Sequence, residues 1–264
     1  CWESAKIRPD NRQGRWLRVI SMNDFHGALE PRRDANGVRR GGAAALAAYV
    51  ARARAECQPP SCTSILLDGG DEFQGSAVSN LAYGRPVVRL FERLGVAAAA
   101  LGNHEFDWGQ DTLRARMREA SYGILAANVL DSLGRDVPWI RDDTIVSLGA
   151  LRVGIVGVAT VTTASVTRPS YVADLRFADP APIVDVRARD LRRRGADAVV
   201  VVAHAGAFCQ RPPVAECSGE IVDLAMRLRE RVDAIVSGHT HSAIATQVRG
   251  IPVIQARSYG SAIA

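Results

Sequence analysis

Short apolar runs alternate with helical patterns along this chain, and this alternation is the feature that most restricts its fold. Each run is bounded by glycine or polar residues, as is typical of buried strands; the runs lie at 16–22, 64–70, 96–102, 122–129, 151–160, 197–203 and 233–238. Helical patterns, several ending in arginine or glycine as helix C-termini prefer, lie at 41–56, 85–95, 110–120, 182–195 and 219–232. Strands that alternate with helices predict an α/β domain in which helices cover the sheets.

The end of the chain departs from this alternation. The segment 243–258 has the pattern of a hairpin that turns at Arg249 and Gly250. We find no linker, repeat or low-complexity segment in the 264 residues, so a single domain is the simplest prediction. The alanine-rich tract 43–55 is interrupted by Arg52 and Arg54, and no run approaches the roughly 18 apolar residues of a membrane helix.

The positive charge of the chain is carried almost entirely by arginine. The net charge is +5, and Lys6 is the only lysine. Arginine blocks such as 191–195 lie where a helix is predicted to end, and cations are favourable there because they complement the helix dipole. A groove for single-stranded nucleic acid would require aromatic residues between these arginines, and there are none. We therefore expect solvated helix faces and no nucleic-acid partner.

Four of the five cysteines flank two short, proline-containing loops. Cys57 and Cys62 enclose one loop, and Cys209 and Cys217 enclose the other. Local pairing would give two disulfides, although four cysteines allow three connectivities and the spacing does not choose between them. Neither pair has the spacing of a zinc or redox motif. Disulfides of this kind indicate an oxidising compartment, so we expect an exported protein.

The fifth cysteine, Cys1, begins the sequence and is followed by a polar segment before the first predicted strand. This arrangement resembles a mature bacterial lipoprotein, which would place the protein in the periplasm or at the cell surface with a lipid anchor at Cys1. The alternative is that Cys1 is merely where the sequence starts. We expect residues 1–15 to form an N-terminal tail, and residues 16–264 to form the domain.

Every histidine of the chain follows a predicted strand. The polar residues found at these strand ends are Asp24, His26, Asp71, Asn103, His104, His204, His239 and His241. In open α/β sheets, ligands bind at the carboxyl ends of the strands, so these side chains should converge on one edge. A single histidine in such a place is more often structural than functional. Five of five, together with two aspartates and an asparagine, predict a functional site.

This set of side chains is typical of divalent metal binding. Carboxylate, imidazole and amide groups without thiolate suit Mn²⁺, Zn²⁺, Fe²⁺ or Co²⁺, and they do not suit a closed structural zinc site. There are too many ligands for one ion, so we expect two ions that share a bridging carboxylate. Two metals about 3.5–4 Å apart form a clamp that is used to attack phosphate esters. Glycines around Asp71 would let the backbone pass close to the ions.

Five motifs in order carry a specific resemblance: DFHG at 24–27, GDEFQGS at 70–76, GNHEFD at 102–107, AHAG at 203–206 and GHTH at 238–241. With these motifs the chain resembles the calcineurin-like metallophosphoesterase superfamily, and most closely its 5′-nucleotidase branch, which includes periplasmic UDP-sugar hydrolases. The resemblance implies a four-layer α/β/β/α sandwich with two mixed sheets. It also places a dimetal site at one edge of the sheets.

The resemblance assigns roles to individual residues. It implies a first ion held by Asp24, His26 and His241, a second held by Asn103, His204 and His239, and Asp71 as the bridge between them. His104 would not bind metal but would donate a hydrogen bond or proton toward the phosphoryl oxygens or the leaving group, held by Asp107. An alternative for Asp107 is a cap on the helix that starts near Gln110. Residues that would orient the ligands or serve the structure are Asp68, Glu72, Gln74 and Glu105.

The function implied is hydrolysis of a small-molecule phosphate ester, with a nucleotide as the expected substrate. A hydroxide bridging the two ions would attack phosphorus in line, without a covalent intermediate. The branch usually continues into a C-terminal substrate-specificity domain, which we expect to be absent from this chain. Two alternatives stay open: a thiosulfohydrolase of the sulfur-oxidation type on the same fold, and a truncated metal-binding module with little turnover. The presence of both His104 and Asp107 argues against the module.

Overall fold

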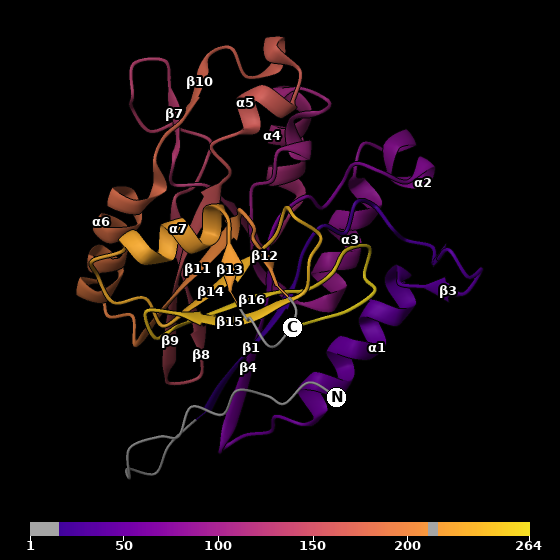
Figure 1. Cartoon of the computed structure of the whole chain (residues 1–264), viewed down its shortest axis with the longest axis horizontal. Helices are drawn as coiled ribbons and strands as arrows, with labels where there is room; N and C mark the ends of the chain where they lie inside the picture. Colours follow the sequence, from indigo (N-terminus) through magenta and orange to yellow (C-terminus); the bar gives the residue numbers. More distant parts are fainter. Residues whose placement is uncertain (1–15, 211–215) are drawn as a thin grey trace.

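A computed structural model describes residues 16–210 and 216–264 of the chain. The predicted tail 1–15, with the candidate lipid anchor at Cys1, lies outside the described residues. Two sheets lie in the middle of the fold, with α1 and α3 on one side and α6 on the other (Figure 1). No helix in the described part of the chain is both long and apolar enough to cross a bilayer.

The first sheet has four parallel strands. Its order is β1 (Trp16–Met22), β4 (Cys62–Asp68), β5 (Val96–Ala100) and β6 (Gly123–Leu125). Beside β1, Ser21 exchanges both backbone hydrogen bonds with Ala264, which is the pattern of an antiparallel pair. The strand predicted at 122–129 is shorter than expected because the N–H groups after Leu125 turn to the carbonyls of Arg141 and Gly157 instead of continuing the ladder.

The second sheet is mixed and has six strands. Its order is β15 (Ile244–Val248), β16 (Ile251–Gln255), β14 (Ala234–Ser237), β11 (Ala198–His204), β9 (Leu151–Ala159) and β8 (Asp143–Leu148). The four inner strands are parallel to one another, and the two edge strands are antiparallel to their neighbours. The hairpin predicted to turn at Arg249 and Gly250 is confirmed as β15 and β16.

Helices cover both outer faces. Against the first sheet lie α1 (Gly42–Ala55), α3 (Arg85–Leu94) and α4 (Gln110–Glu119), and against the second lie α6 (Pro180–Arg193) and α7 (Glu220–Arg227). The smaller elements are α2 (Ala77–Leu81), α5 (Thr163–Val166), the 3₁₀ turns His104–Phe106 and Pro169–Tyr171, and the paired short strands β2 (Arg32–Arg33) with β3 (Arg39–Arg40), β7 (Val129–Asp131) with β10 (Leu175–Phe177), and β12 (Phe208–Cys209) with β13 (Cys217–Ser218).

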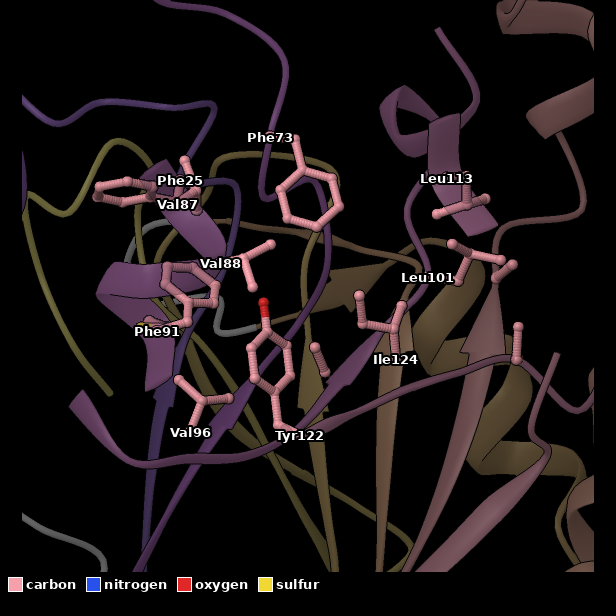
Figure 2. Packing of buried hydrophobic residues seen from close by; sticks show 14 of the residues in the cluster. Phe25, Phe73, Val87, Val88, Phe91, Val96, Leu101, Leu113, Tyr122 and Ile124 are labelled. Atoms are coloured by element: carbon pink, nitrogen blue, oxygen red, sulfur yellow. The ribbon is translucent and has the colours of Figure 1, made fainter. Parts of the chain in front are cut away.

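Three layers of buried apolar side chains separate these elements, as a four-layer sandwich requires. Along β4, Leu66 faces the helices of the first sheet, whereas Ile65 and Leu67 face the second sheet, because side chains alternate along a strand. Figure 2 shows part of the first layer, in which Phe91 and Tyr122 pack with ring centroids 6.0 Å apart. The third layer lies between the second sheet and α6 and α7. The predicted α/β/β/α architecture is confirmed.

One predicted helix is too long. The pattern 219–232 predicts a helix to residue 232, but α7 ends at Arg227 and Leu228 is extended. The backbone after α7 is hydrogen-bonded to α6 instead. The Asp185 carboxylate of α6 accepts the N–H groups of Arg229 and Glu230, both at 2.9 Å. A carboxylate far away in the sequence therefore ends the helix.

The two cysteine loops are each closed locally. Cys57 is bonded to Cys62, and Cys209 is bonded to Cys217. The connectivity that the sequence left open is thus the sequential one. The second disulfide joins β12 to β13 in the loop that follows His204.

Candidate dimetal centre

The carboxyl ends of five strands meet at one edge of the two sheets. Asp24 and His26 follow β1, Asp71 follows β4, Asn103 and His104 follow β5, His204 ends β11, and His239 and His241 follow β14. Most of these side chains line one cavity of about 270 Å³, and Asp24 and His204 are buried beside them. The structure thus brings together all eight polar residues that the sequence singled out at these strand ends.

One group of side chains consists of Asp24, His26 and His241. The Nε2 atoms of the two histidines are 3.0 Å apart, and the Asp24 Oδ1 is 3.2 Å from the His241 Nε2. Asp24 is fully buried, and its carboxylate also accepts the backbone N–H of His239 at 2.9 Å. Three candidate ligand atoms therefore converge at the carboxyl end of β1.

A second group forms around His204, which is fully buried at the end of β11. Its Nε2 is 3.1 Å from the Asn103 Oδ1, 3.1 Å from the Asp71 Oδ2 and 3.2 Å from the His239 Nδ1. The ligand atoms that Asp71, His204 and His239 offer all lie within 4.8 Å of one another. An amide oxygen, a carboxylate and two imidazoles thus point at one position.

Asp71 contacts both groups. Its Oδ2 is 3.1 Å from the His204 Nε2 and 3.8 Å from the His26 Nε2. Its Oδ1 accepts the backbone N–H of His104 at 3.0 Å. The carboxylate therefore lies between the two groups, with one oxygen facing the histidines and the other holding the neighbouring loop.

Most of these residues occupy an unusual backbone conformation. Positive φ angles between 49° and 79° occur at Asp24, His26, Asp71, His239 and His241. Residues with a side chain rarely adopt this left-handed region, and such strain costs about 1–3 kcal/mol per residue and clusters at functional sites. Five strained residues around one cavity indicate that the rest of the fold offsets this cost in free energy and holds these side chains toward the cavity.

Backbone carbonyls fix the orientation of two histidine rings. The Nδ1 of His26 lies 3.1 Å from the Gln74 carbonyl oxygen, and the Nδ1 of His204 lies 2.8 Å from that of Gly69. A carbonyl can only accept, so each Nδ1 is the donor and carries the proton of the neutral ring. Each Nε2 then keeps its lone pair toward the cavity, which is the arrangement usual for metal-bound histidine.

The donor atoms fit two divalent cations. Imidazole nitrogens of two residues approach to 3.0 Å in the first group and to 3.2 Å in the second, and one cation could be bound by both nitrogens of a pair, since Zn²⁺ or a similar ion binds imidazole nitrogen at about 2.0–2.1 Å. The side chains by themselves already favour added positive charge. Although burial opposes protonation of His204, the charge and the hydrogen bond of Asp71 raise the pKa of this histidine to about 10.

The carboxylates and histidines of the cavity shift one another's protonation. Burial opposes ionisation of Asp71, but the charge and hydrogen bond of His204 hold the pKa of that carboxyl below its usual range. Burial is also the largest effect on His26, and there it lowers the pKa of the ring. The cavity thus favours an ionised carboxylate beside a neutral His26, both of which are metal-binding forms.

His104 lies against the first group without belonging to it. Its ring centroid is 5.3 Å from that of His26, and its Nδ1 is 2.7 Å from the Asp107 Oδ2. This hydrogen bond is the largest influence on the ring and raises the pKa of His104 to about 9. The alternative role of Asp107 as a helix cap does not match the structure, because α4 begins after Gly109 and has no side-chain cap.

Glu105 ties together the loops that follow β4 and β5. Its Oε2 accepts the backbone N–H groups of Asp71 at 3.0 Å and Gly102 at 2.9 Å, and its Oε1 accepts that of Glu72 at 2.8 Å. Burial, followed by the charge of Asp71, raises the pKa of the Glu105 carboxyl to about 7. Glu105 therefore positions the Asp71 loop, as one of the residues expected to orient the ligands.

Asp68 and Glu72 serve the structure beneath the site. Both are buried, and burial raises the pKa of each carboxyl well above its usual range. The Asp68 Oδ2 accepts the backbone N–H of Gly70 at 2.8 Å, and the Glu72 Oε2 accepts the Tyr122 hydroxyl at 2.5 Å. Neither side chain is among those that line the cavity.

Two residues that line the cavity were not predicted from the sequence. Arg32, from β2, and Tyr259, shortly before the last described residues, both contribute to its wall. They belong to none of the five motifs and to no predicted strand end. No local sequence signal identifies them, because the pairing of distant loops brings them to the cavity.

The chain matches a family model described as calcineurin-like phosphoesterase over residues 17–243. The endonuclease YhcR of Bacillus subtilis (strain 168) is 30% identical over 268 residues, covering 94% of this chain and 21% of that protein. The structure of a 5′-nucleotidase precursor from Thermus thermophilus superposes with a TM-score of 0.76 at 28% identity, covering 94% of this chain and 50% of that one.

The sulfate thiohydrolase SoxB of Thermus thermophilus superposes with a TM-score of 0.79 at 20% identity, covering 98% of this chain and 54% of that one. This likeness shows a shared fold. The chain spans less than half the length of the curated relatives that it matches.

Proposed function

This chain belongs to the calcineurin-like phosphoesterase family, and from this premise we propose that it is a metal-dependent hydrolase of phosphate esters, of the 5′-nucleotidase type. The observation that carries the proposal is the pair of ligand groups that Asp71 joins, with the His104 and Asp107 pair at their edge. A structural metal site would need neither the second group nor a histidine that faces the cavity without binding.

Each group of side chains would hold one ion. Asp24, His26 and His241 would bind the first, Asn103, His204 and His239 the second, and Asp71 would be shared between them. When bound, two divalent ions activate a water as the nucleophile and neutralise the charge that grows on the phosphoryl oxygens. The ligands suit Mn²⁺, Zn²⁺, Fe²⁺ or Co²⁺.

His104 would act on the substrate directly. Its Nδ1 is engaged by Asp107, so the Nε2 is the atom left to meet a phosphoryl oxygen or the leaving group. The Asp107 carboxylate keeps the ring protonated, because it raises the pKa of His104 to about 9. A proton donor positioned in this way contributes about 10²–10⁴-fold to a rate. Asp107 acts through His104 and is a positioning residue.

The substrate class that we propose is a small phosphate ester, and a nucleotide is the substrate that we expect. The 5′-nucleotidase precursor from Thermus thermophilus supports it, since 94% of the chain superposes on that structure. Export to an oxidising compartment is part of the proposal and is supported by the two disulfides, which are rare in reducing compartments.

A substrate panel tests the proposal. The chain, loaded with Mn²⁺, is assayed against an aryl phosphate, AMP, UDP-glucose, a cyclic nucleotide, single-stranded DNA and protein-bound thiosulfonate. Release of phosphate from the aryl ester or the nucleotides is the expected result. Turnover of thiosulfonate alone would assign a thiosulfohydrolase, and cleavage of DNA alone would assign a nuclease. Full metal content without any turnover would reduce the chain to a binding module.

A further inference from the structure

The guanidinium of Arg32 lies over the ring of Tyr259, with its Cζ 4.0 Å from the ring centroid. The Tyr259 ring in turn lies 5.5 Å from the ring centroids of both His26 and His241. Tyr259 therefore lies between the first ligand group and Arg32, with its ring tilted against His26, edge-on to His241 and covered by the Arg32 guanidinium. Stacking of this kind holds an arginine in place through a cation–π interaction while its N–H groups stay available.

Tyr259 is fixed by the backbone. Its φ of 60° lies in the left-handed region, where an aromatic residue is strained. Its N–H donates to the carbonyl of Asp24 at 2.8 Å, and its carbonyl accepts the N–H of Gly42 at 3.0 Å. The same backbone that carries a ligand thus positions the ring under Arg32, and strain of this kind is found where a side chain must be aimed.

The guanidinium of Arg32 keeps its charge available to a ligand. Two neighbours in the hairpin are engaged locally, since Arg40 pairs with the Asp34 carboxylate at 2.6 Å and Arg33 donates to the carbonyl of Gly37 at 2.8 Å. Within residues 16–210 and 216–264, the structure gives Arg32 no carboxylate partner. Its side chain is exposed at the cavity, where an anion could reach it.

Arg32 also separates two hollows. It lines the cavity of about 270 Å³ that holds the ligand groups, and a neighbouring hollow of about 190 Å³ formed with residues 28–31 and 76–78. No other residue in the described part of the chain lines both hollows. A substrate whose reacting group enters the first cavity could therefore extend past Arg32 into the second.

We propose that Arg32, held on Tyr259, is a subsite for a second anionic group of the substrate, such as the neighbouring phosphate of a phosphoanhydride. This proposal rests on the proposed phosphoesterase function. Tyr259 lies between Arg32 and the ligand histidines, and all of them line the same cavity, so an anion bound by the guanidinium would lie beside the reacting phosphoryl group. A planar guanidinium suits this task because it binds two phosphate oxygens at once.

Calorimetry on the metal-loaded chain tests the subsite with two probes, methylenediphosphonate and inorganic phosphate. Arg32→Ala should lose about 10-fold or more in affinity for the diphosphonate, as expected when a charged hydrogen bond is removed. Its affinity for phosphate should change much less. Arg32→Lys should lie between, because lysine keeps the charge without the planar fork.

Arg39→Ala is the matched control, since Arg39 is an exposed arginine of the same hairpin that lines neither hollow. It should bind both probes as the parent chain does. Equal losses for the two probes in Arg32→Ala would place the guanidinium on the reacting group and overturn the proposal, as would no loss for either. Failure of the phosphoesterase function would show separately, as absence of ester hydrolysis by the unsubstituted chain.

Discussion

The backbone N–H of His104 donates to the Oδ1 of Asp71 at 3.0 Å, so the proposed bridging carboxylate also holds the loop of the proposed proton donor. The other oxygen of Asp71 faces His204 and His26. The two oxygens therefore have separate tasks, and the ligand groups and His104 are positioned by one side chain.

The first prediction concerns metal content. Asp71→Asn should weaken both metal sites together, because the amide keeps the size of the carboxylate but removes the charge that both groups share. Asn103→Ala should chiefly lose one ion, because the Asn103 Oδ1 approaches His204 of the second group. Elemental analysis after dialysis counts the ions per chain. A full complement in Asp71→Asn would refute the bridging role.

The second prediction concerns Glu105. Glu105→Gln should destabilise the fold by about 1–3 kcal/mol, because the amide nitrogen would face backbone N–H groups that then lose their acceptor in a buried place. Urea unfolding, followed by circular dichroism, measures the change. Glu56→Gln is the control, since Glu56 makes exposed ion pairs and should change stability little. Equal stability of the two variants would show that Glu105 does not clamp the loops.

The third prediction concerns the cysteines. Thiol titration of the denatured, unreduced protein should find at most one free thiol, from Cys1, because the other four cysteines are paired. After reduction the same titration should find five. Four or five thiols before reduction would show that the disulfides do not form in the purified protein, and would remove the main support for export.

Much of the fold could be predicted from local patterns. All seven apolar runs overlap a strand, and the five helical patterns each overlap a helix. These patterns are local, because burial of one face or of both faces of an element fixes its hydrophobic periodicity. The short pairs of strands β2 with β3 and β7 with β10 were missed. Their pairing depends on turns and on contacts between distant segments, and their few residues carry no periodicity.

The candidate site shows the same division. The histidines and aspartates could be found because the carboxyl ends of strands converge, which is a property of the fold class. Features that depend on contacts between distant segments could not be found, and the end of α7, outside the site, is one example because it depends on Asp185 of another helix. Arg32 and Tyr259 likewise reach the cavity only through tertiary contacts, and the positive φ of Tyr259 leaves no trace in the sequence.

The last prediction separates proton donation from metal binding. His104→Gln should reduce kcat on an aryl phosphate by about 10²-fold or more with unchanged metal content, because only a contact to the reacting group is removed. Asp107→Asn should reduce kcat less. The amide can still orient the ring, but it no longer supplies the charge that raises the pKa of His104.

Asp111→Asn is the matched control for this pair, since Asp111 is an exposed acid in the first turn of the neighbouring α4 and should leave kcat unchanged. Steady-state kinetics and elemental analysis on the same samples decide the matter. Loss of metal in His104→Gln would make His104 a ligand, contrary to the role proposed for it beside the two groups. Unchanged kcat with full metal content would mean that the leaving group departs without help from His104, and the role of the pair would have to be given up.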